Sequence, residues 1–495
     1  MANHDNSTYV QTRSKDYTNH LDKWKLIRSV MACEVTEYLR NVGANEATEA
    51  AQHARQKAYE DGAIFYNFVS RTVKGMVGSV YRKDPTIELP PEVEYLLTDA
   101  DGNSQSLIQQ SQEAVQEDIL LGRLGLFTDM PASKVDENGR AIPPSLQDQN
   151  DGMLNPRIQL YQTESIINWR VERIGSVNKL AMVVLAEDFE YQSGENEFLW
   201  LVGKQYRVLD FDENGFYRQR VWRYNQVGEL FDGDGGSSYI DLSPKANGQF
   251  MTEIPFVFVG ADNNDYTIDE PPIYPMAELN VGHYRNTADN EELLFIIAQA
   301  MLVIAPEKSI AAKWNEANPD GVKFGARRGL NVGEGGSAML LQASPTSALT
   351  EAIKHKEEQA VQIGAQLITP TQQVTAESAR IQRGADTSVL SSISNNVSNG
   401  YEKAIQWCLD FLGSTAEFTF TLSNDFFFGS LTPQDVDSIV KAWQAGAISK
   451  DVMDRYLVDG GVIDDKVDLD DMNEDIKNED GMVDLDAPED APNVD

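Results

Sequence analysis

The sequence predicts an α+β chain, in which helices and an antiparallel sheet come from separate stretches. Three observations support this. Apolar residues recur at helical spacing from 21 to about 82. Between 157 and 260, runs rich in Val, Ile, Phe, Tyr and Trp alternate with turn signals such as Asn214-Gly215, which is typical of strands. After residue 271, long stretches regain helical spacing. The 495 residues are enough for about three domains.

The first 130 residues are predicted to be mainly helical. Residues 1–20 are polar and are expected to form a flexible arm. The helical pattern over 21–82 ends at the breaker Lys83-Asp84-Pro85. A second amphipathic helix is expected over 106–121, followed by a short strand at 124–128.

The strand-rich stretch is interpreted as an antiparallel meander with one exposed face. The predicted strands are 158–161, 166–171, 179–191, 197–211, 216–224 and 254–259. Charged residues recur along them, and these positions are assigned to the exposed face: Arg170, Glu172, Glu187, Arg207, Arg218 and Arg220.

The second half of the chain is predicted to return to long helices. The expected elements are helices at about 275–300, 347–367 and 376–412, an irregular Gly-rich stretch at 307–346, a strand at 417–422 and two small helices within 432–458. Ser449 is placed as the N-cap of the last helix. Residues 459–495 contain fifteen Asp or Glu but only two Lys, and residues 476–495 are expected to be disordered.

Composition narrows the classes of function. The 41 Lys and Arg against 78 Asp and Glu give a net charge of −37. This argues against a protein that grips nucleic acid by neutralising many phosphates, although a duplex could still slide past it. Two cysteines, Cys33 and Cys408, make no disulfide framework and are interpreted as buried small apolar residues. No apolar stretch is long enough to span a bilayer, and a soluble protein made in a cytoplasm is expected.

No chemical motif exceeds background. Gly333-Glu-Gly335-Gly-Ser-Ala338 matches G-x-G-x-x-A, but the residues after Ala338 are strand-like, so a glycine turn is the interpretation. Asp99-Ala-Asp101-Gly-Asn103 resembles the start of a calcium loop with its glycine misplaced. No cofactor, metal site or catalytic residue is predicted. None of the histidines has a metal-ligand spacing. Packing or interface roles are assigned to the two in the long helices, His283 and His355, with a proton-switch role as the alternative.

The order of these elements resembles that of the portal protein of tailed bacteriophages, the head-to-tail connector, over about residues 20–460. Local stretches that carry the resemblance are 66–78, 121–126, 161–170, 277–285 and 443–449. The resemblance implies a portal-like subunit with a helical and antiparallel-sheet wing, long stem helices, an α/β clip and a helical crown. Its implied parts are wing 21–270, first stem helix 271–300, clip 301–346, second stem helix 347–367, tunnel loop 368–375, wing long helix and strand 376–429, and crown 430–475.

The resemblance also implies site residues. The DNA channel or tunnel loop would carry Thr369, Pro370, Thr371, Gln372, Gln373, Lys354 and Lys356. The clip interface would carry Lys313, Trp314, Lys323, Arg327 and Arg328. The lysines of the second long helix also suit i,i+4 pairs with its glutamates, and this is the favoured interpretation of their role. Small residues in these helices favour close approach to neighbouring chains: Ala288, Ala298, Ala352, Ala360, Gly364 and Ala365.

The function implied is a ring, expected to be a homododecamer, at one capsid vertex of the virion. Double-stranded DNA would pass through it without sequence recognition during packaging and ejection. The other implied partners are the terminase large subunit, a head-tail adaptor and the major capsid or scaffolding protein, with no membrane. Assembly would occur in the bacterial host cytoplasm, and the chain would have no enzymatic activity. Two alternatives stay open: another virion structural protein of the capsid or tail tube, and a metal-dependent carboxylate hydrolase.

Overall fold

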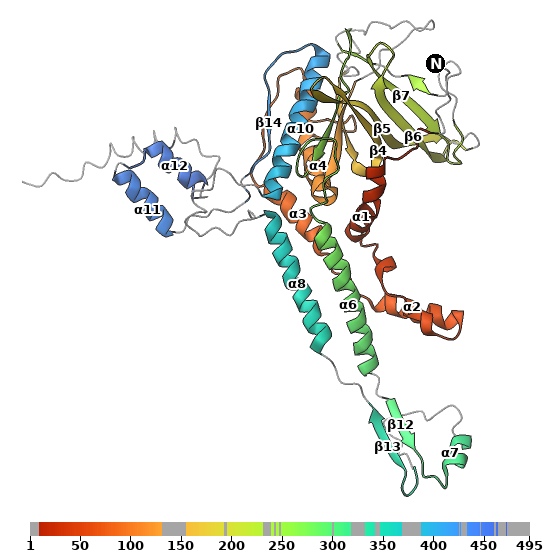
Figure 1. The fold of residues 1–495 in the computed structure, drawn as a ribbon. Helices are drawn as coiled ribbons and strands as arrows, with labels where there is room; N and C mark the ends of the chain where they lie inside the picture. The colour runs from red at the N-terminus through yellow and green to blue at the C-terminus, as the bar shows by residue number, and fades with distance from the viewer. Residues whose placement is uncertain are drawn as a thin grey trace, which may run out of the picture. The chain divides into compact units, whose positions relative to one another are not determined.

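A computed structural model gives the arrangement of the chain (Figure 1). It describes residues 9–130, 155–192, 196–230, 239–241, 244–246, 249–298, 301–317, 332–341, 347–368, 388–424, 426, 433–445, 447–459, 462–463 and 472. The chain divides into two compact units, Met1–Asn424 and Asp425–Asp495. Among the described residues, no helix is long and apolar enough to cross a membrane.

The N-terminal helical pattern is divided into three helices. They are α1 (Lys15–Met31), α2 (Glu49–Gly62) and α3 (Phe68–Val80). Residues 15–20 are therefore helical, and the arm predicted over 1–20 is wrong for them. Ser14 is the reason, because its side chain accepts a hydrogen bond from the Tyr17 amide at 3.1 Å and caps the helix. After α1 the backbone turns through Cys33, at φ 61°, and leaves this residue exposed rather than buried as predicted.

Short elements link these helices to the rest of the unit. They are the 3-10 helices η1 (Thr36–Tyr38), η2 (Gly43–Asn45), η3 (Glu94–Leu97) and η4 (Thr163–Ser165), and the paired strands β1 (Thr86–Glu88) and β14 (Thr419–Thr421). Helix α4 (Leu107–Leu121) begins at a capping box between Ser106 and Gln109, which confirms the predicted start.

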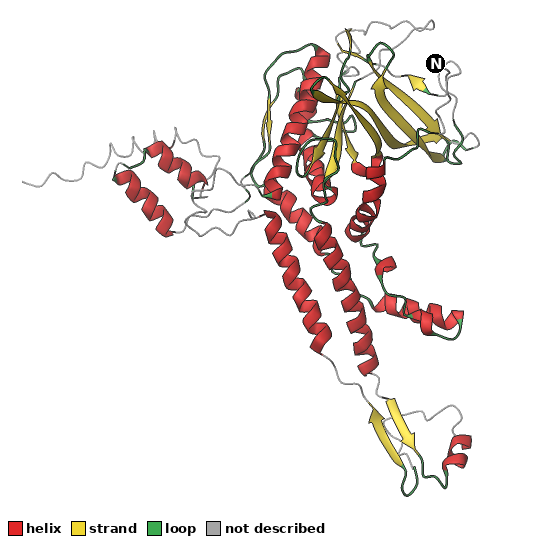
Figure 2. Ribbon diagram, viewed as in Figure 1, coloured by secondary structure: helices red, strands yellow, loops and turns green. Residues whose placement is uncertain are grey.

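The strands form two main sheets (Figure 2). One has the order β4-β5-β6-β7-β8, with strands at Ile166–Ile174, Val177–Gln192, Trp200–Phe211, Tyr217–Tyr224 and Ile240–Asp241. The other has the order β11-β2-β3, with strands at Phe256–Gly260, Arg123–Asp129 and Arg157–Gln162. A small pair consists of β9 (Lys245–Ala246) and β10 (Gln249–Phe250). The predicted meander is confirmed for β4 to β7, but two predicted strands belong to the second sheet.

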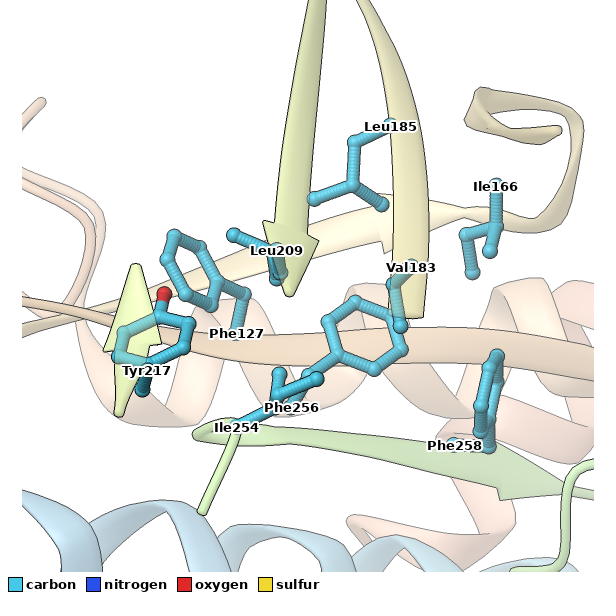
Figure 3. Close-up of a cluster of buried hydrophobic side chains, with 9 residues drawn as sticks. All are labelled: Phe127, Ile166, Val183, Leu185, Leu209, Tyr217, Ile254, Phe256 and Phe258. Atoms are coloured by element: carbon cyan, nitrogen blue, oxygen red, sulfur yellow. The ribbon is translucent and has the colours of Figure 1, made fainter. Parts of the chain in front are cut away.

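The core of this region lies where the two sheets pack together (Figure 3). Phe127 of β2 and Phe256 of β11 contribute from one sheet, and Val183 of β5 and Leu209 of β6 contribute from the other. The remaining members are Ile166, Leu185, Tyr217, Ile254 and Phe258. Because side chains alternate along each strand, a single face of the five-stranded sheet supplies this core.

Of the six charged residues assigned to an exposed face, four are partly buried and take part in ion pairs. Glu187 and Arg207 lie on the side of the sheet that faces the core and form an ion pair at 2.8 Å. Arg218 and Arg220 both bind Asp210, at 2.8 and 2.6 Å. The sequence pattern could not distinguish these paired residues from solvated ones, because charged residues of both kinds recur at every second position of a strand. Arg170 and Glu172 are exposed as predicted.

Helix α10 (Val389–Leu412) covers the three-stranded sheet and also contacts α4. Its described part confirms the predicted helix from residue 389, and 376–387 lie outside the described residues. The helix approaches β11 closely at Gly400. A methyl group there would lie 2.5 Å from Cγ2 of Val259.

We therefore expect Gly400→Ala to destabilise the protein by about 1–3 kcal/mol, because Val259 or the helix must move. The matched control is Gly75→Ala on α3, where an added methyl group meets no atom within 4 Å. That variant should gain about 0.5–1 kcal/mol from helix propensity. Urea unfolding of both variants checks the prediction. Equal effects at the two positions would contradict the close packing of α10 on β11.

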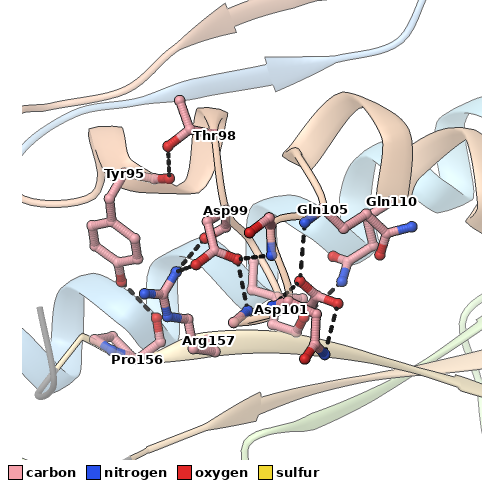
Figure 4. Close-up of polar contacts among 12 residues, drawn as sticks. Tyr95, Thr98, Asp99, Asp101, Gln105, Gln110, Pro156 and Arg157 are labelled. Carbon is pink, nitrogen blue, oxygen red and sulfur yellow. Dashed lines mark hydrogen bonds and ion pairs between the residues drawn. The ribbon is translucent and has the colours of Figure 1, made fainter.

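The turn before α4 is stabilised by its own carboxylates (Figure 4). Asp99 accepts hydrogen bonds from the amides of Gly102 and Ser104, both at 2.9 Å, and forms an ion pair with Arg157 at 2.9 Å. Asp101 accepts from the Asn103 amide at 2.7 Å. These carboxylates bind protein donors, which disfavours the calcium-loop interpretation. Within the described residues, no group of three or more His, Cys, Asp or Glu is arranged to hold a metal ion.

After β11 the chain enters its long helices. The elements are α6 (Tyr274–Ala298), β12 (Met301–Ala305), α7 (Ala311–Ala317), β13 (Ser337–Leu341) and α8 (Ser347–Ile368). The helices predicted at about 275–300 and 347–367 are confirmed as α6 and α8. The stretch 307–346, predicted to be irregular, contains α7 and β13.

The second unit contains α11 (Pro433–Gln444) and α12 (Lys450–Asp459), which pack against each other. They confirm the two predicted small helices. The Val452 amide donates to the Ser449 hydroxyl at 3.4 Å, so Ser449 caps α12 as predicted. The predicted acidic tail, 476–495, lies outside the described residues.

Candidate assembly site

Helices α6 and α8 lie side by side and contact each other through small residues (Figure 1). A methyl group on Gly282 of α6 would lie 3.3 Å from Cε of Lys356 on α8. A methyl group on Gly364 of α8 would lie 3.5 Å from Cε of Met276 on α6. Ala360 is buried between these points. Small residues allow these two helices of one chain to approach closely, whereas the predicted close approach to neighbouring chains stays a prediction.

A buried histidine also joins the two helices. Nε2 of His283 on α6 lies 3.5 Å from Oε1 of Glu357 on α8. The centre of the His283 ring lies 4.8 Å from the centre of the Phe68 ring. Burial lowers the pKa of His283 below its ordinary value, and the nearby Glu357 carboxylate offsets part of this effect. The predicted packing role of His283 is confirmed. His355, in contrast, is exposed on α8.

A brace of residues 36–62 covers one side of α6. Asp289 accepts a hydrogen bond from the Tyr59 hydroxyl at 2.7 Å and forms an ion pair with Arg40 at 2.8 Å. Arg55 of α2 forms an ion pair with Glu292 one turn further along α6. Sequence reasoning missed this brace. The sequence contains one indication of it, the acidic residues Asp289 and Glu292 three positions apart in a predicted helix. Their spacing does not identify the distant basic partners.

The remaining sides of the helix pair expose apolar residues. Leu294 and Phe295 of α6 and Val361 of α8 are exposed. Val361 lies near Gly364, which contacts Met276 close to the start of α6, whereas Leu294 and Phe295 lie close to its end, so these side chains do not form one contiguous patch.

The chain between these helices contains a two-stranded sheet. Strands β12 and β13 are antiparallel, and Val303 pairs with Met339. These two side chains are 39% and 59% exposed. Gly333 and Gly335, at φ 85° and 104°, form the turn that leads into β13, which confirms the glycine-turn interpretation. A two-stranded sheet is marginally stable alone and needs further packing.

The structure describes part of the predicted site. Lys354 is exposed on α8, and Lys356 is half-buried against Gly282. Lys313 is exposed and Trp314 half-buried on α7. The other predicted positions lie outside the described residues: Thr369, Pro370, Thr371, Gln372, Gln373, Lys323, Arg327 and Arg328. The roles assigned to all these residues stay predictions.

The part of the chain that contains the helix pair matches a known protein family. A family model described as a domain of unknown function, DUF4055, matches residues 272–412, which include α6, β12, β13 and α8. No curated protein matches the chain.

The solved structures that are similar to the chain include two from gene transfer agent particles and one of a phage portal protein. A chain of the virion of a native gene transfer agent particle is 13% identical, with 80% of this chain and 90% of that chain covered and a TM-score of 0.35. A chain from the neck of the empty particle is 15% identical, with 82% and 92% covered and a TM-score of 0.36.

The third similar structure is an HK97-family phage portal protein from Corynebacterium diphtheriae. It is 10% identical, with 72% of this chain and 92% of that chain covered and a TM-score of 0.25.

Proposed function

We propose that this chain is a phage portal protein, whose copies form a ring at one vertex of a virion capsid. The observation that carries the proposal is the connection of α6 and α8 by the exposed two-stranded sheet. The paired helices expose Phe295 and Val361, and the sheet exposes Val303 and Met339. Neighbouring copies would bury these side chains, so the part of the chain from 272 to 368 gains stability from assembly.

Double-stranded DNA would pass through the ring without sequence recognition. The net charge of −37 disfavours tight binding of a duplex and suits a conduit from which DNA must be released. Exposed Lys354 and the uncharged stretch 369–373 are the proposed points of contact with passing phosphates. In this role the chain needs no catalytic activity, and ATP hydrolysis would belong to the packaging motor.

The proposed partners follow from this position. The terminase large subunit and later the head-tail adaptor would dock at 301–346, with Lys313 and Trp314 in the contact. The major capsid or scaffolding protein would contact the ring at the vertex. The proposed number of copies is twelve.

Mass photometry and negative-stain images of the purified chain test the proposal. Twelve-membered rings with a central hole are expected, whereas a chain that stays monomeric at micromolar concentration would overturn it. Six-membered rings would favour a tail-tube protein instead. A rise in melting temperature with millimolar Mg²⁺ or Mn²⁺, together with hydrolytic turnover, would favour a metal-dependent hydrolase.

We expect the double substitution Val303→Asp and Met339→Asp to prevent ring formation. Two added carboxylates per copy would have to be buried between neighbouring copies, which costs several kcal/mol unless they are paired. The matched control is Ile174→Asp with Val177→Asp, which changes an exposed apolar pair at the β4–β5 turn. Mass photometry should find monomers for the first variant and rings for the control. Rings from both variants would exclude this sheet from the interface.

A further inference from the structure

The end of the β5–β6 hairpin exposes several large apolar side chains. Phe198 is 85% exposed and Trp200 is 58% exposed, and Leu199 and Val202 are also exposed. Soluble proteins rarely expose large apolar residues in a contiguous group unless the group contacts a partner.

The hairpin register places these side chains together. Trp200 pairs with Gln192, and Val202 pairs with Glu190. Because side chains alternate along a strand, Trp200 and Val202 lie on the same face of the sheet. The turn after β7 contacts the opposite face, because the Gln226 amide donates at 3.0 Å to the hydroxyl of Tyr191, which pairs with Leu201. We call Phe198, Leu199, Trp200 and Val202 the apolar tip.

Hydrogen bonds and close packing hold the tip in place. The Gln192 side chain donates to the Glu197 carbonyl at 2.8 Å, and the Phe198 amide donates to the Asn196 side chain at 3.0 Å. Gly203 lies against Phe189, where a methyl group would be 2.6 Å from Cε1 of that ring. The apolar side chains are therefore presented on an ordered base, which reduces the entropy lost when a partner binds.

The surroundings of the tip are acidic. Glu190 and Glu197 are exposed beside it, and Glu229 is exposed in the turn after β7. Over the described ranges, none of the three forms an ion pair, whereas the nearby Lys204 is already paired with Asp188. A second copy of the tip would bring like charges together, and the net charge of −37 adds to this repulsion. Nucleic acid and anionic membranes are disfavoured for the same reason.

We propose that the apolar tip docks into an apolar groove with a Lys- or Arg-rich rim on a different protein. The aromatic side chains would fill the groove, and the three glutamates would face the basic rim. The inference rests on the proposed function only in taking this partner to be another component of the virion. Every copy in a ring would present one tip, so weak contacts would add to a firm attachment.

Photo-crosslinking in the producing cells tests this, with p-benzoylphenylalanine at position 198 of the full-length chain. Mass spectrometry should identify a crosslink to one virion protein, at a segment flanked by Lys or Arg. The same chain with Glu190→Lys, Glu197→Lys and Glu229→Lys should lose at least tenfold in crosslink yield. The photoreactive residue at position 174, at the opposite end of the sheet, is the matched control and should not give this crosslink.

Crosslinks only between copies of this chain, or none, would overturn the proposal. A yield unchanged by the three lysines would also overturn it, because the charge argument would then be wrong. The variant Phe198→Ser with Trp200→Ser should keep its melting temperature and its ring, since both side chains are exposed. Loss of the ring in this variant would assign the tip to contacts between copies. A parent chain that never forms rings contradicts the proposed function. A crosslink to a segment flanked by Lys or Arg would still support docking of the apolar tip.

Discussion

Replacement of Arg28 by Ala is expected to destabilise the protein by about 3–5 kcal/mol, because it leaves a buried carboxylate without its partner. Arg28 of α1 binds Glu117 of α4 through two hydrogen bonds, at 2.5 and 2.9 Å. It also binds Glu164 of η4 through two more, at 2.8 and 3.0 Å. The Glu117 side chain is 3% exposed. One guanidinium therefore joins three elements that are distant in sequence.

The loss should depend on pH. Burial raises the pKa of Glu117 above its ordinary value of 4.5, and the Arg28 guanidinium offsets part of this rise. Without Arg28 the pKa of Glu117 rises further. A raised pKa in the folded state means that stability falls as pH increases from the unfolded value toward the folded one. The variant should therefore differ most from the parent at neutral pH and least near pH 4.

Urea unfolding at several pH values measures this effect. The control is Arg170→Ala, which removes an exposed ion pair with Glu172 and should cost no more than about 1 kcal/mol. A loss below that value for Arg28→Ala at neutral pH would show that water or another group satisfies Glu117.

These contacts also show how far the sequence can predict the fold. The start of α4 was predictable because Ser106 and Gln109 form a cap within four residues. Strands β4 to β7 of the five-stranded sheet were predictable because their period is local, whereas the two-residue strand β8 was not predicted. The pairing of Arg28 with Glu117 and Glu164 was not, because it joins residues 89 and 136 positions apart.

The same limit applies to the candidate site. The two long helices follow from apolar spacing, and both are present as α6 and α8. The brace on α6 depends on Arg40 and Tyr59 reaching Asp289, about 230 residues away in the case of Tyr59. Whether a charged strand residue such as Arg207 is solvated or paired also depends on which sheet covers it, and the sequence does not specify this.

Removal of the carboxylate of Asp118 is expected to stabilise the protein at neutral and alkaline pH. Asp118 of α4 is fully buried, and neither of its side-chain oxygens has a hydrogen-bond partner among the residues that the structure describes. Burial raises the pKa of this group well above 3.8, and the negative charges of Asp269 and Asp262 raise it further. The folded chain therefore retains a proton at this site where the unfolded chain has lost it. Stability then decreases by up to about 1.4 kcal/mol for each pH unit between the unfolded and folded pKa values.

Asp118→Asn and the similarly sized Asp118→Leu remove this titration, so their stability should depend less on pH than that of the parent. The gain should be largest at high pH and smallest at low pH, because the parent carboxyl is neutral in both states only below its ordinary pKa of 3.8. An exposed carboxyl on α10 provides the control, and Asp410→Asn should change stability by no more than about 0.5 kcal/mol at any pH. Urea unfolding between pH 4 and pH 9 distinguishes the outcomes. If both variants at position 118 are less stable than the parent at pH 8, the ionised carboxylate must be compensated in the folded protein by a bound cation or ordered water. A gain in the Leu variant alone would show that the unpaired polar atoms, rather than the charge, cause the cost.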